Sequence, residues 1–270
     1  MALTKGQIAA LNAIKSGCDL TSYVAGSTPL NRDGKRISAD IDVFNDSAER
    51  ASEAADVGAA RLLAHGFTLQ WVRRSGGTHT LIAERDGEKV KLEWVADSDF
   101  RFFPPVPDPL FGYMLHPIDL ATNKVIAAAD RRELRDIVDL VSIHKDVLPL
   151  GALIWAAVEK SPGLSPEAML AEIRRNAHHP RAAWAALSSE QPIDPETTLA
   201  ELRTALDEAD AFIRAMPTEK IGRLFLLQDN IVQPAPERLQ DYVEHKGVRG
   251  GHWPSSPEIA SAMAARFGAK

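Results

Sequence analysis

The sequence predicts an α+β fold: a small mixed β-sheet with flanking helices, followed by a mainly helical C-terminal domain. Strand-like and helix-like segments alternate through residues 1–115, which is typical of a mixed sheet with helices packed on it. Asp86-Gly87 separates two strand-like runs, a strong hairpin signal. From residue 116 onward helical periodicity dominates. We therefore expect two domains, residues 1–115 and residues 116–270.

The first predicted elements alternate between helix and strand. Residues 4–16 have the periodicity of a short amphipathic helix. Asp46–Glu49 resembles a capping box, which predicts the start of an Ala-rich helix that ends at Gly66. Residues 67–73 then read as the next strand.

Asp40 and Asp42 form the most informative pair in the chain. On a strand, side chains at i and i+2 point to the same face, so Ile41 and Val43 turn the other way into a core. The strand thus presents two hard oxygen ligands. An Asp-x-Asp pair alone is more often a solvated strand face or turn, so its context decides its interpretation.

Glu93 supplies that context, as a third carboxylate on a later strand. Leu92 and Trp94 flank it with the alternation of a half-buried strand, which places Glu93 on the more polar face. The predicted hairpin of residues 78–84 and 88–95 can carry Glu93 beside the Asp-x-Asp strand. Three carboxylates suit a pair of Mg²⁺ ions that stabilise the attacking and leaving oxygens of a phosphoryl transfer. We expect two Mg²⁺ ions, with Mn²⁺ as an alternative.

Gly26-Ser27 precedes Asp40 by twelve residues. A glycine lets the backbone approach a ligand closely, and backbone amides with a hydroxyl can bind a triphosphate. The combination indicates a two-metal site for a nucleoside triphosphate.

At this point the residues resemble a family. Ala25–Thr28 followed by Arg36–Phe44 resembles the opening motif of the DNA polymerase β-type nucleotidyltransferase superfamily, particularly its AbiEii-like toxin branch. Asp119–Val125 and Arg132–Leu140 are similar to the third and fourth motifs of that branch. The resemblance covers about residues 20–145. It implies that the predicted sheet is a nucleotidyltransferase core.

The resemblance also implies a role for each site residue. Metal binding would fall to Asp40, Asp42 and Glu93, and nucleotide binding to Gly26, Ser27, Arg36, Lys124 and Arg132. The catalytic set would comprise the three metal ligands with Lys124, Asp136 and Asp139. Many relatives carry Asp where this chain has Glu93, although superfamily members use either acid.

The biology implied by the resemblance is that of a bacterial toxin–antitoxin system. Relatives of this kind transfer nucleotides to tRNA acceptor ends and are restrained by an adjacent antitoxin. The expected partners are therefore a nucleoside triphosphate, a tRNA acceptor and a cognate antitoxin protein. This step rests on family analogy alone.

The second half is expected to carry Lys124 and the two later aspartates on consecutive helices. Residues 119–128 predict one helix, and Asp130–Glu133 resembles a capping box that opens the next. Arg132, Asp136 and Asp139 would then share one face. Without the resemblance, the Arg132–Asp136 pair reads as a surface salt bridge. With it, we favour the two aspartates orienting Lys124 or the nucleotide sugar.

Several further boundaries follow from proline, glycine and charge. Residues 102–109 cannot continue a helix or a central strand, which predicts a crossover between domains that ends near His116-Pro117. Residues 188–196 predict a linker before a helix over 197–216. Residues 222–232 predict a small hairpin, and 246–256 a loop before a terminal helix.

Composition sets outer bounds on function. The 270 residues are 45% hydrophobic and 25% charged, as expected of a globular chain. A formal net charge of −6 argues against a protein that binds nucleic acid over its whole surface, but it is compatible with a local basic groove. The single Cys18, with neither a secretion signal nor a membrane span, favours a cytoplasmic protein without membrane contact.

Two alternatives to a tRNA-modifying enzyme stay open. One is a nucleotidyltransferase acting on a protein side chain or on a small molecule such as an aminoglycoside. An acidic acceptor pocket would favour a cationic small molecule, and a long basic groove would favour RNA. The other is a catalytically idle module that binds a nucleotide or docks an antitoxin.

Overall fold

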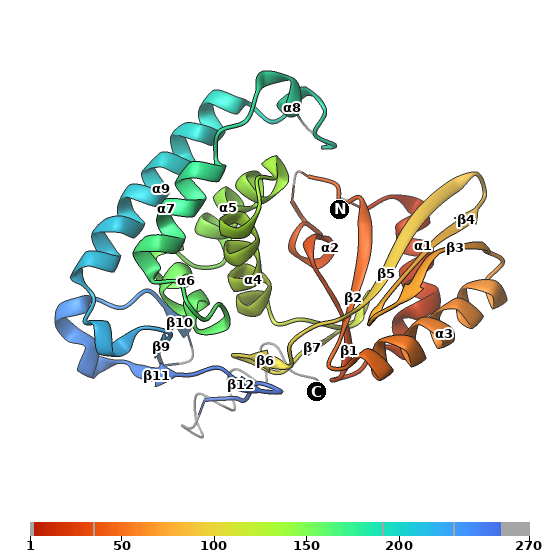
Figure 1. The fold of residues 1–270 in the computed structure, drawn as a ribbon, viewed down its shortest axis with the longest axis horizontal. Coiled ribbons are helices and arrows are strands. Elements are labelled where there is room, and N and C mark those ends of the chain that lie inside the picture. Colours follow the sequence, from red (N-terminus) through yellow and green to blue (C-terminus); the bar gives the residue numbers. More distant parts are fainter. Residues whose placement is uncertain (1–2, 35, 191, 229, 255–270) are drawn as a thin grey trace.

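The computed structural model describes residues 3–34, 36–190, 192–228 and 230–254. It confirms the α+β class: a mixed sheet with helices on it is followed by a mainly helical half (Figure 1). The large sheet has seven strands among the described residues, in the order β3-β4-β5-β2-β1-β8-β7. The sheet is therefore larger than the small one that the sequence predicts.

The sheet places the Asp-x-Asp strand at its centre. β2 runs antiparallel to β1 and parallel to β5, with the Cα atoms of Asp42 and Glu93 in register. The seven strands are β1 (Ser22–Ala25), β2 (Asp40–Asn45), β3 (Thr68–Ser75), β4 (Thr78–Arg85), β5 (Glu88–Ala96), β7 (Val106–Asp108) and β8 (Gly112–Met114).

The predicted hairpin forms as expected between β4 and β5. Asp86 and Gly87 both have positive φ, 56° and 79°. Two positive φ values give a two-residue turn whose twist matches that of the flanking strands. The turn fixes the register of the pair, and the register in turn fixes which face Glu93 occupies.

One face of the sheet is covered by α1 (Lys5–Ile14) and α3 (Ala48–Ala64), as the sequence predicts. The residues buried there include Ile41, Val43, Leu81, Leu92 and Trp94. Ser47 is the N-cap of α3 and accepts a hydrogen bond from the Arg50 amide. The predicted cap at Asp46 is therefore wrong by one residue, because Asp46 pairs with the buried Arg101 instead.

The segment predicted as a crossover contains an edge strand, which the sequence did not predict. Pro107 lies within β7, at the edge of the sheet, where a missing N–H costs no ladder hydrogen bond. The carboxylate of Asp119 accepts hydrogen bonds from the amides of Phe102 and Phe103 at 2.8 and 3.0 Å. This buried acid fixes the chain as it leaves the sheet for the helical half.

The helical half packs around its own core, which includes Trp155 and Phe212. Its α-helices are α4 (Pro117–Asp130), α5 (Leu134–Asp146), α6 (Leu150–Ala157), α7 (Pro166–Asn176), α8 (Arg181–Ala185) and α9 (Pro195–Ala215). Short 3-10 turns occur at Lys15–Gly17, Val158–Lys160, Thr218–Lys220 and Pro236–Asp241. The short helix α2 (Ser27–Leu30) contacts β1, β2 and α4, and so joins the two halves.

Two small sheets complete the described chain. β9 (Leu224–Leu227) and β10 (Asn230–Val232) form the predicted hairpin, and β11 (Val243–His245) adds an unpredicted third strand. β12 (Val248–Arg249) pairs with β6 (Phe100–Arg101). The predicted terminal helix lies outside the described residues. The domain boundary at residue 115 stays a prediction, although α4 begins two residues later.

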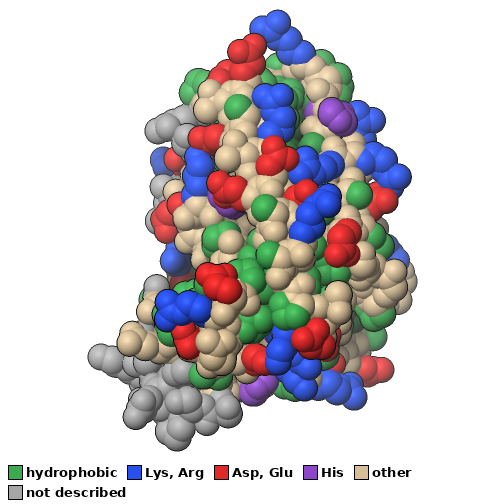
Figure 2. Space-filling view, turned by 90° about the vertical axis from the view of Figure 1, so that its left-hand side faces the viewer, with side chains coloured by type: hydrophobic (Ala, Val, Ile, Leu, Met, Phe, Trp, Pro, Cys, Tyr) green, Lys and Arg blue, Asp and Glu red, His purple; other side chains and the backbone are tan. Residues whose placement is uncertain are grey.

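The surface of the helical half carries both signs of charge. Figure 2 shows acidic and basic side chains interspersed over this face, with no continuous basic track on it. No helix in the described part of the chain has the length and apolar character needed to cross a membrane.

Candidate active site

The three predicted metal ligands meet on the sheet face opposite α1 and α3. Asp40 and Asp42 alternate with the buried Ile41 and Val43 on β2, and Glu93 faces the same side from β5. One ligand oxygen from each of the three carboxylates lies within 4.8 Å of the others. The prediction that the hairpin brings Glu93 beside the Asp-x-Asp strand is confirmed.

The charge of this triad fits a divalent cation. Burial, followed by repulsion from Asp40 and Glu93, raises the pKa of Asp42 to about 7. Glu93 accepts a hydrogen bond from Thr80 at 3.1 Å. Asp42 forms no ion pair with any described residue. Three carboxylates paired with a single cation, Lys91, keep an excess of negative charge, and their oxygens are a donor set that suits Mg²⁺ or Mn²⁺.

The raised pKa of Asp42 predicts how metal binding depends on pH. The pKa of Asp42 in the folded protein, about 7, lies above its ordinary value of 3.8. Ionisation of Asp42 therefore lowers the stability of the metal-free protein as the pH rises from about 4 to about 7. Mg²⁺ requires the ionised carboxylate and therefore competes with a proton below pH 7. We expect Mg²⁺ to raise the melting temperature more at about pH 8 than at about pH 6. Calorimetry at both values checks this, and equal shifts would contradict it.

Gly26 follows β1, at the N-cap of α2, with a backbone that only glycine adopts easily. Its φ is +69°, and a Cβ built at this position would lie 2.1 Å from Oδ2 of Asp42. The main chain therefore passes directly against a metal-binding carboxylate. This close approach is the physical reason for the glycine in the Gly26-Ser27 motif.

Gly26→Ala should damage the metal site more than the fold. The strained φ costs on the order of 1–2 kcal/mol of unfolding free energy, and the methyl group must also displace Asp42. Gly76→Ala is the matched control, because Gly76 has a φ of +59° and no atom near its Cβ position. We expect Gly26→Ala to lose more stability than Gly76→Ala, and Gly26→Ala alone to lose metal binding. Equal metal binding in the two would contradict the assignment.

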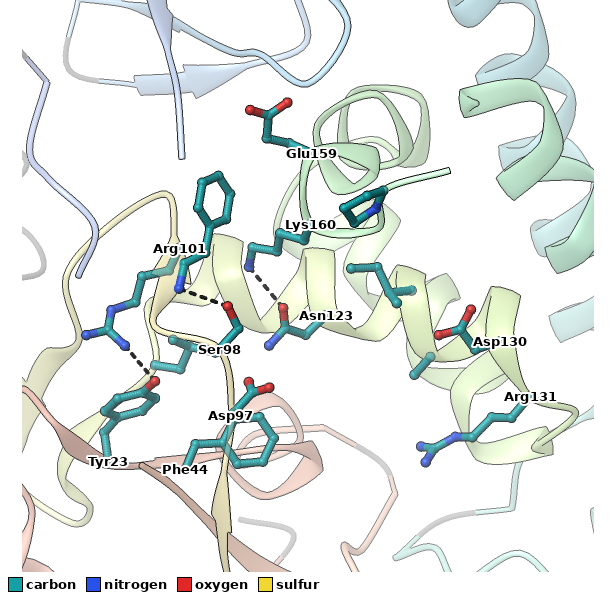
Figure 3. Close-up of a pocket in the computed structure, with 15 residues that line it drawn as sticks. Tyr23, Phe44, Asp97, Ser98, Arg101, Asn123, Asp130, Arg131, Glu159 and Lys160 are labelled. Carbon is teal, nitrogen blue, oxygen red and sulfur yellow. Dashed lines mark hydrogen bonds between the residues drawn. The ribbon is translucent and has the colours of Figure 1, made fainter. Parts of the chain in front are cut away.

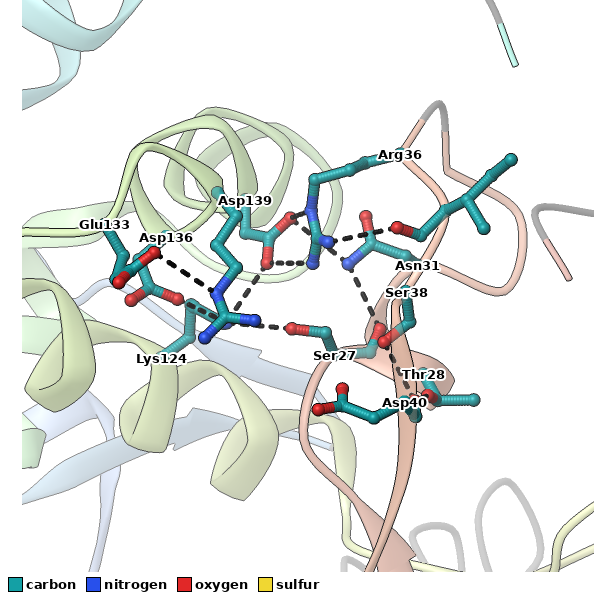
Figure 4. A network of polar contacts seen from close by, with 12 residues as sticks. Ser27, Thr28, Asn31, Arg36, Ser38, Asp40, Lys124, Glu133, Asp136 and Asp139 are labelled. Carbon is teal, nitrogen blue, oxygen red and sulfur yellow. Dashed lines mark hydrogen bonds and ion pairs between the residues drawn. The ribbon is translucent and has the colours of Figure 1, made fainter. Parts of the chain in front are cut away.

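Lys124 lies at the centre of a buried ion network between the two halves (Figure 4). Its side chain is 6% exposed, and its Nζ lies 2.7 Å from Asp136 and 3.1 Å from Asp139. The same Nζ donates to Oγ of Ser27 at 3.1 Å. The structure therefore brings Lys124 and Ser27 together, and both aspartates orient the lysine.

The aspartates of this network each hold a second cation. Asp136 accepts from Nε of Arg131 at 2.7 Å. Burial alone would raise the pKa of Asp136, but the hydrogen bond from Arg131 and the charge of Lys124 hold that pKa below its ordinary value. Asp139 accepts two hydrogen bonds from Arg36, each at 2.8 Å. Three cations thus face two carboxylates, which leaves net positive charge beside the triad.

Two residues predicted to bind nucleotide have other contacts. Arg36 is 4% exposed and joins the segment before β2 to α5 through Asp139. Arg132 donates to the main-chain carbonyl of His178, not to Asp136. The predicted Arg132–Asp136 pair is wrong, because Glu133 is the N-cap of α5 and Arg132 lies before the helix. Arg131, one residue earlier, takes the predicted position, and sequence reasoning missed it.

Six of the ten predicted site residues line a pocket of about 320 Å³. Arg36, Arg132, Asp136 and Asp139 are not part of its lining, although both aspartates contact Lys124. The lining consists of Gly26, Ser27, Asp40, Asp42, Phe44, Glu93, Val95, Leu120, Asn123, Lys124, Ala127, Arg131 and Arg135. The pocket thus brings the carboxylate triad, the Gly-Ser pair and Lys124 into one space.

A larger cavity of about 680 Å³ adjoins this pocket and shares Phe44, Asn123, Ala127 and Arg131 with it (Figure 3). Besides Arg131, two cations line this cavity, and both form ion pairs: Arg101 with Asp46 at 2.8 Å and Lys160 with Asp119 at 2.7 Å.

Three acids complete the charged lining of the larger cavity: Asp97, Asp130 and Glu159. None of them forms an ion pair with any described residue. The unpaired charge of the larger cavity is therefore acidic.

Comparison with known proteins adds little to this geometry. No protein-family model matches the sequence, and no curated protein matches it. Among solved structures, the chain is similar to MenT4, a nucleotidyltransferase toxin from Mycobacterium tuberculosis H37Rv, at 15% identity and a TM-score of 0.48. The match covers 78% of this chain and 82% of that one. A similarity of this size carries no argument about activity, so the function has to be inferred from the site.

Proposed function

We propose that this protein is a metal-dependent nucleotidyltransferase that moves a nucleoside monophosphate from a nucleoside triphosphate to an acceptor hydroxyl. The observation that carries the proposal is the pocket in which Asp40, Asp42 and Glu93 lie with Gly26-Ser27 and Lys124. Carboxylates for a metal, a close backbone approach and a buried lysine are the groups that nucleotidyl transfer requires in one place.

The chain's own groups divide the work of the reaction. Asp40, Asp42 and Glu93 would hold Mg²⁺, which when bound stabilises charge that develops on phosphate oxygens. Ser27 and Lys124 would bind the triphosphate beside the triad, with Asp136 and Asp139 fixing the lysine. The acceptor hydroxyl would give up its proton to Glu93 or to water as its oxygen bonds to the α-phosphorus, the bond from that phosphorus to the bridging oxygen breaks, and pyrophosphate leaves.

We further propose, on the resemblance of the sequence motifs to AbiEii-like toxins, that the acceptor is tRNA. On the same ground the protein would be the cytoplasmic toxin of a bacterial toxin–antitoxin pair, restrained by a cognate antitoxin. The single excess positive charge of the network that Arg36, Lys124 and Arg131 form with Asp136 and Asp139 supports binding of phosphate groups.

A small cationic acceptor is the second candidate, and a specific observation favours it. The larger cavity presents Asp97, Asp130 and Glu159, whereas Arg101 is neutralised by Asp46 and Lys160 by the buried Asp119. Such a lining attracts an amine-bearing molecule more than a phosphate backbone.

Label transfer distinguishes the acceptors. Purified protein with Mg²⁺ and each α-labelled nucleoside triphosphate is incubated with cellular RNA, cellular protein or an aminoglycoside, and the products are separated. Label in tRNA supports the first candidate, and label in the aminoglycoside supports the second. Absence of label from every acceptor, together with Mg²⁺-dependent nucleotide binding, would contradict the enzyme and favour an idle binding module.

A further inference from the structure

Lys91 is the one described cation that forms ion pairs with the carboxylate triad. It lies on β5 two residues before Glu93, so both side chains point to the same face of the sheet. Its Nζ is 2.9 Å from Oε1 of Glu93 and 3.5 Å from Oδ2 of Asp40. The ammonium group thus contacts two of the three predicted metal ligands.

The cations that line the pocket pair with other acids. Lys124 and Arg131 pair with Asp136, and Arg135 lies 3.8 Å from Glu133. These two acids belong to α5 and to its N-cap. Lys91 has no such anchor and remains 44% exposed on a flexible four-carbon stem.

An ammonium group in contact with a carboxylate competes with a divalent ion for the same negative charge. Mg²⁺ binds oxygens at about 2.0–2.1 Å and excludes other groups from its shell. A lysine in hydrogen-bond contact with those oxygens would also repel the ion, because like charges a few Å apart repel strongly. A metal that binds Glu93 and Asp40 therefore weakens their contacts with Lys91.

We propose that Lys91 is a built-in counter-ion of the metal site: it neutralises the triad before metal binds and is displaced into solvent by the ion. This inference rests on the proposed function, since it requires the triad to be the metal site. Lys91 thereby lowers the affinity of the site for free metal and sets the metal concentration at which the site fills.

Metal titration of a variant tests the competition directly. Mn²⁺ binding is followed by the loss of the free-ion signal in electron paramagnetic resonance at constant ionic strength and about pH 8, where carboxylates are ionised. We expect Lys91→Gln to bind Mn²⁺ roughly tenfold more tightly than the unaltered protein, because a competing charge is removed. Equal or weaker binding would overturn the proposal.

Lys89→Gln is the matched control. Lys89 lies two residues before Lys91 on the same face of β5, is 68% exposed, and pairs with Glu84 at 3.7 Å instead of with the triad. We expect its Mn²⁺ affinity to equal that of the unaltered protein. A gain as large as that of Lys91→Gln would show a general charge effect and overturn the specific role of Lys91.

A second measurement uses the unaltered protein and does not depend on a variant that folds. Acetylation of each lysine is measured by mass spectrometry with and without Mg²⁺. We expect Mg²⁺ to increase the labelling rate of Lys91 several-fold and to leave Lys89 unchanged. A rate for Lys91 that Mg²⁺ leaves unchanged or lowers would overturn the proposal.

The titration also tests the metal site separately from the counter-ion role of Lys91. If neither the unaltered protein nor Lys91→Gln binds Mn²⁺, the metal site itself is wrong, and the role of Lys91 is wrong with it. If both bind with the same affinity, the metal site stands and only the counter-ion role of Lys91 is overturned.

Discussion

Asp42→Asn is expected to reduce nucleotidyl transfer by at least about 10³-fold, because a metal ligand supplies several kcal/mol of charge stabilisation in such a site. The same change should raise the melting temperature of the metal-free protein at about pH 8, since burial, Asp40 and Glu93 all disfavour the charge that Asn lacks. Loss of activity together with a gain in stability is a signature that a damaged fold cannot produce.

Asp207→Asn serves as the control for Asp42→Asn. Asp207 lies on α9 with its side chain 71% exposed, and its pair with Arg174 is a surface contact. Asp207→Asn should leave both the activity and the melting temperature equal, within error, to those of the unaltered protein. Transfer assays and calorimetry on the same preparations provide the comparison. An Asp42→Asn protein with full activity would contradict the metal site, whatever its stability.

Lys124→Met is expected to lower both activity and stability. From the sequence alone, Lys124→Ala is predicted to reduce turnover more than folding stability. The structure changes that expectation, because Lys124 is buried between Asp136 and Asp139. Removing one partner from a buried ion cluster costs on the order of 3 kcal/mol of unfolding free energy. Loss of a preorganised cation beside the phosphates should lower transfer about 10²–10³-fold.

The two effects of Lys124→Met are separated by measuring transfer at a temperature where urea denaturation shows the variant to be fully folded. Lys145→Met is the control, since Lys145 is 50% exposed in a surface pair with Glu201. That change should cost less than about 1 kcal/mol. A folded Lys124→Met protein with unchanged transfer would contradict the role of Lys124 in the site. Unchanged stability would contradict its role in the ion network.

Features that depend on local chain geometry could be predicted from the sequence. Asp86-Gly87 fixes a two-residue turn, the turn fixes the register of β4 and β5, and alternation along β5 places Glu93 on the polar face. The same alternation puts Asp40 and Asp42 opposite Ile41 and Val43. Each step uses side-chain direction in a strand, which period-2 patterns determine.

Features that depend on helix boundaries and on distant pairing could not be predicted. Arg132 looked like the partner of Asp136 because a helix was expected to start at residue 130, whereas α5 begins at Leu134 and Arg131 makes the contact. The Arg36–Asp139 pair joins residues 103 positions apart, which no local pattern encodes. Lys91 was detectable in principle, since it precedes Glu93 by two residues on the same polar face.

The measurement that tests the central claim most directly is a comparison of α-labelled and γ-labelled nucleoside triphosphate with Mg²⁺ and the acceptor identified by label transfer. Nucleotidyl transfer predicts that the α label enters the acceptor while the γ label leaves as pyrophosphate, and that Asp42→Asn abolishes both. Transfer of the γ label to the acceptor, or release of pyrophosphate that is unaffected by Asp42→Asn, would contradict the account.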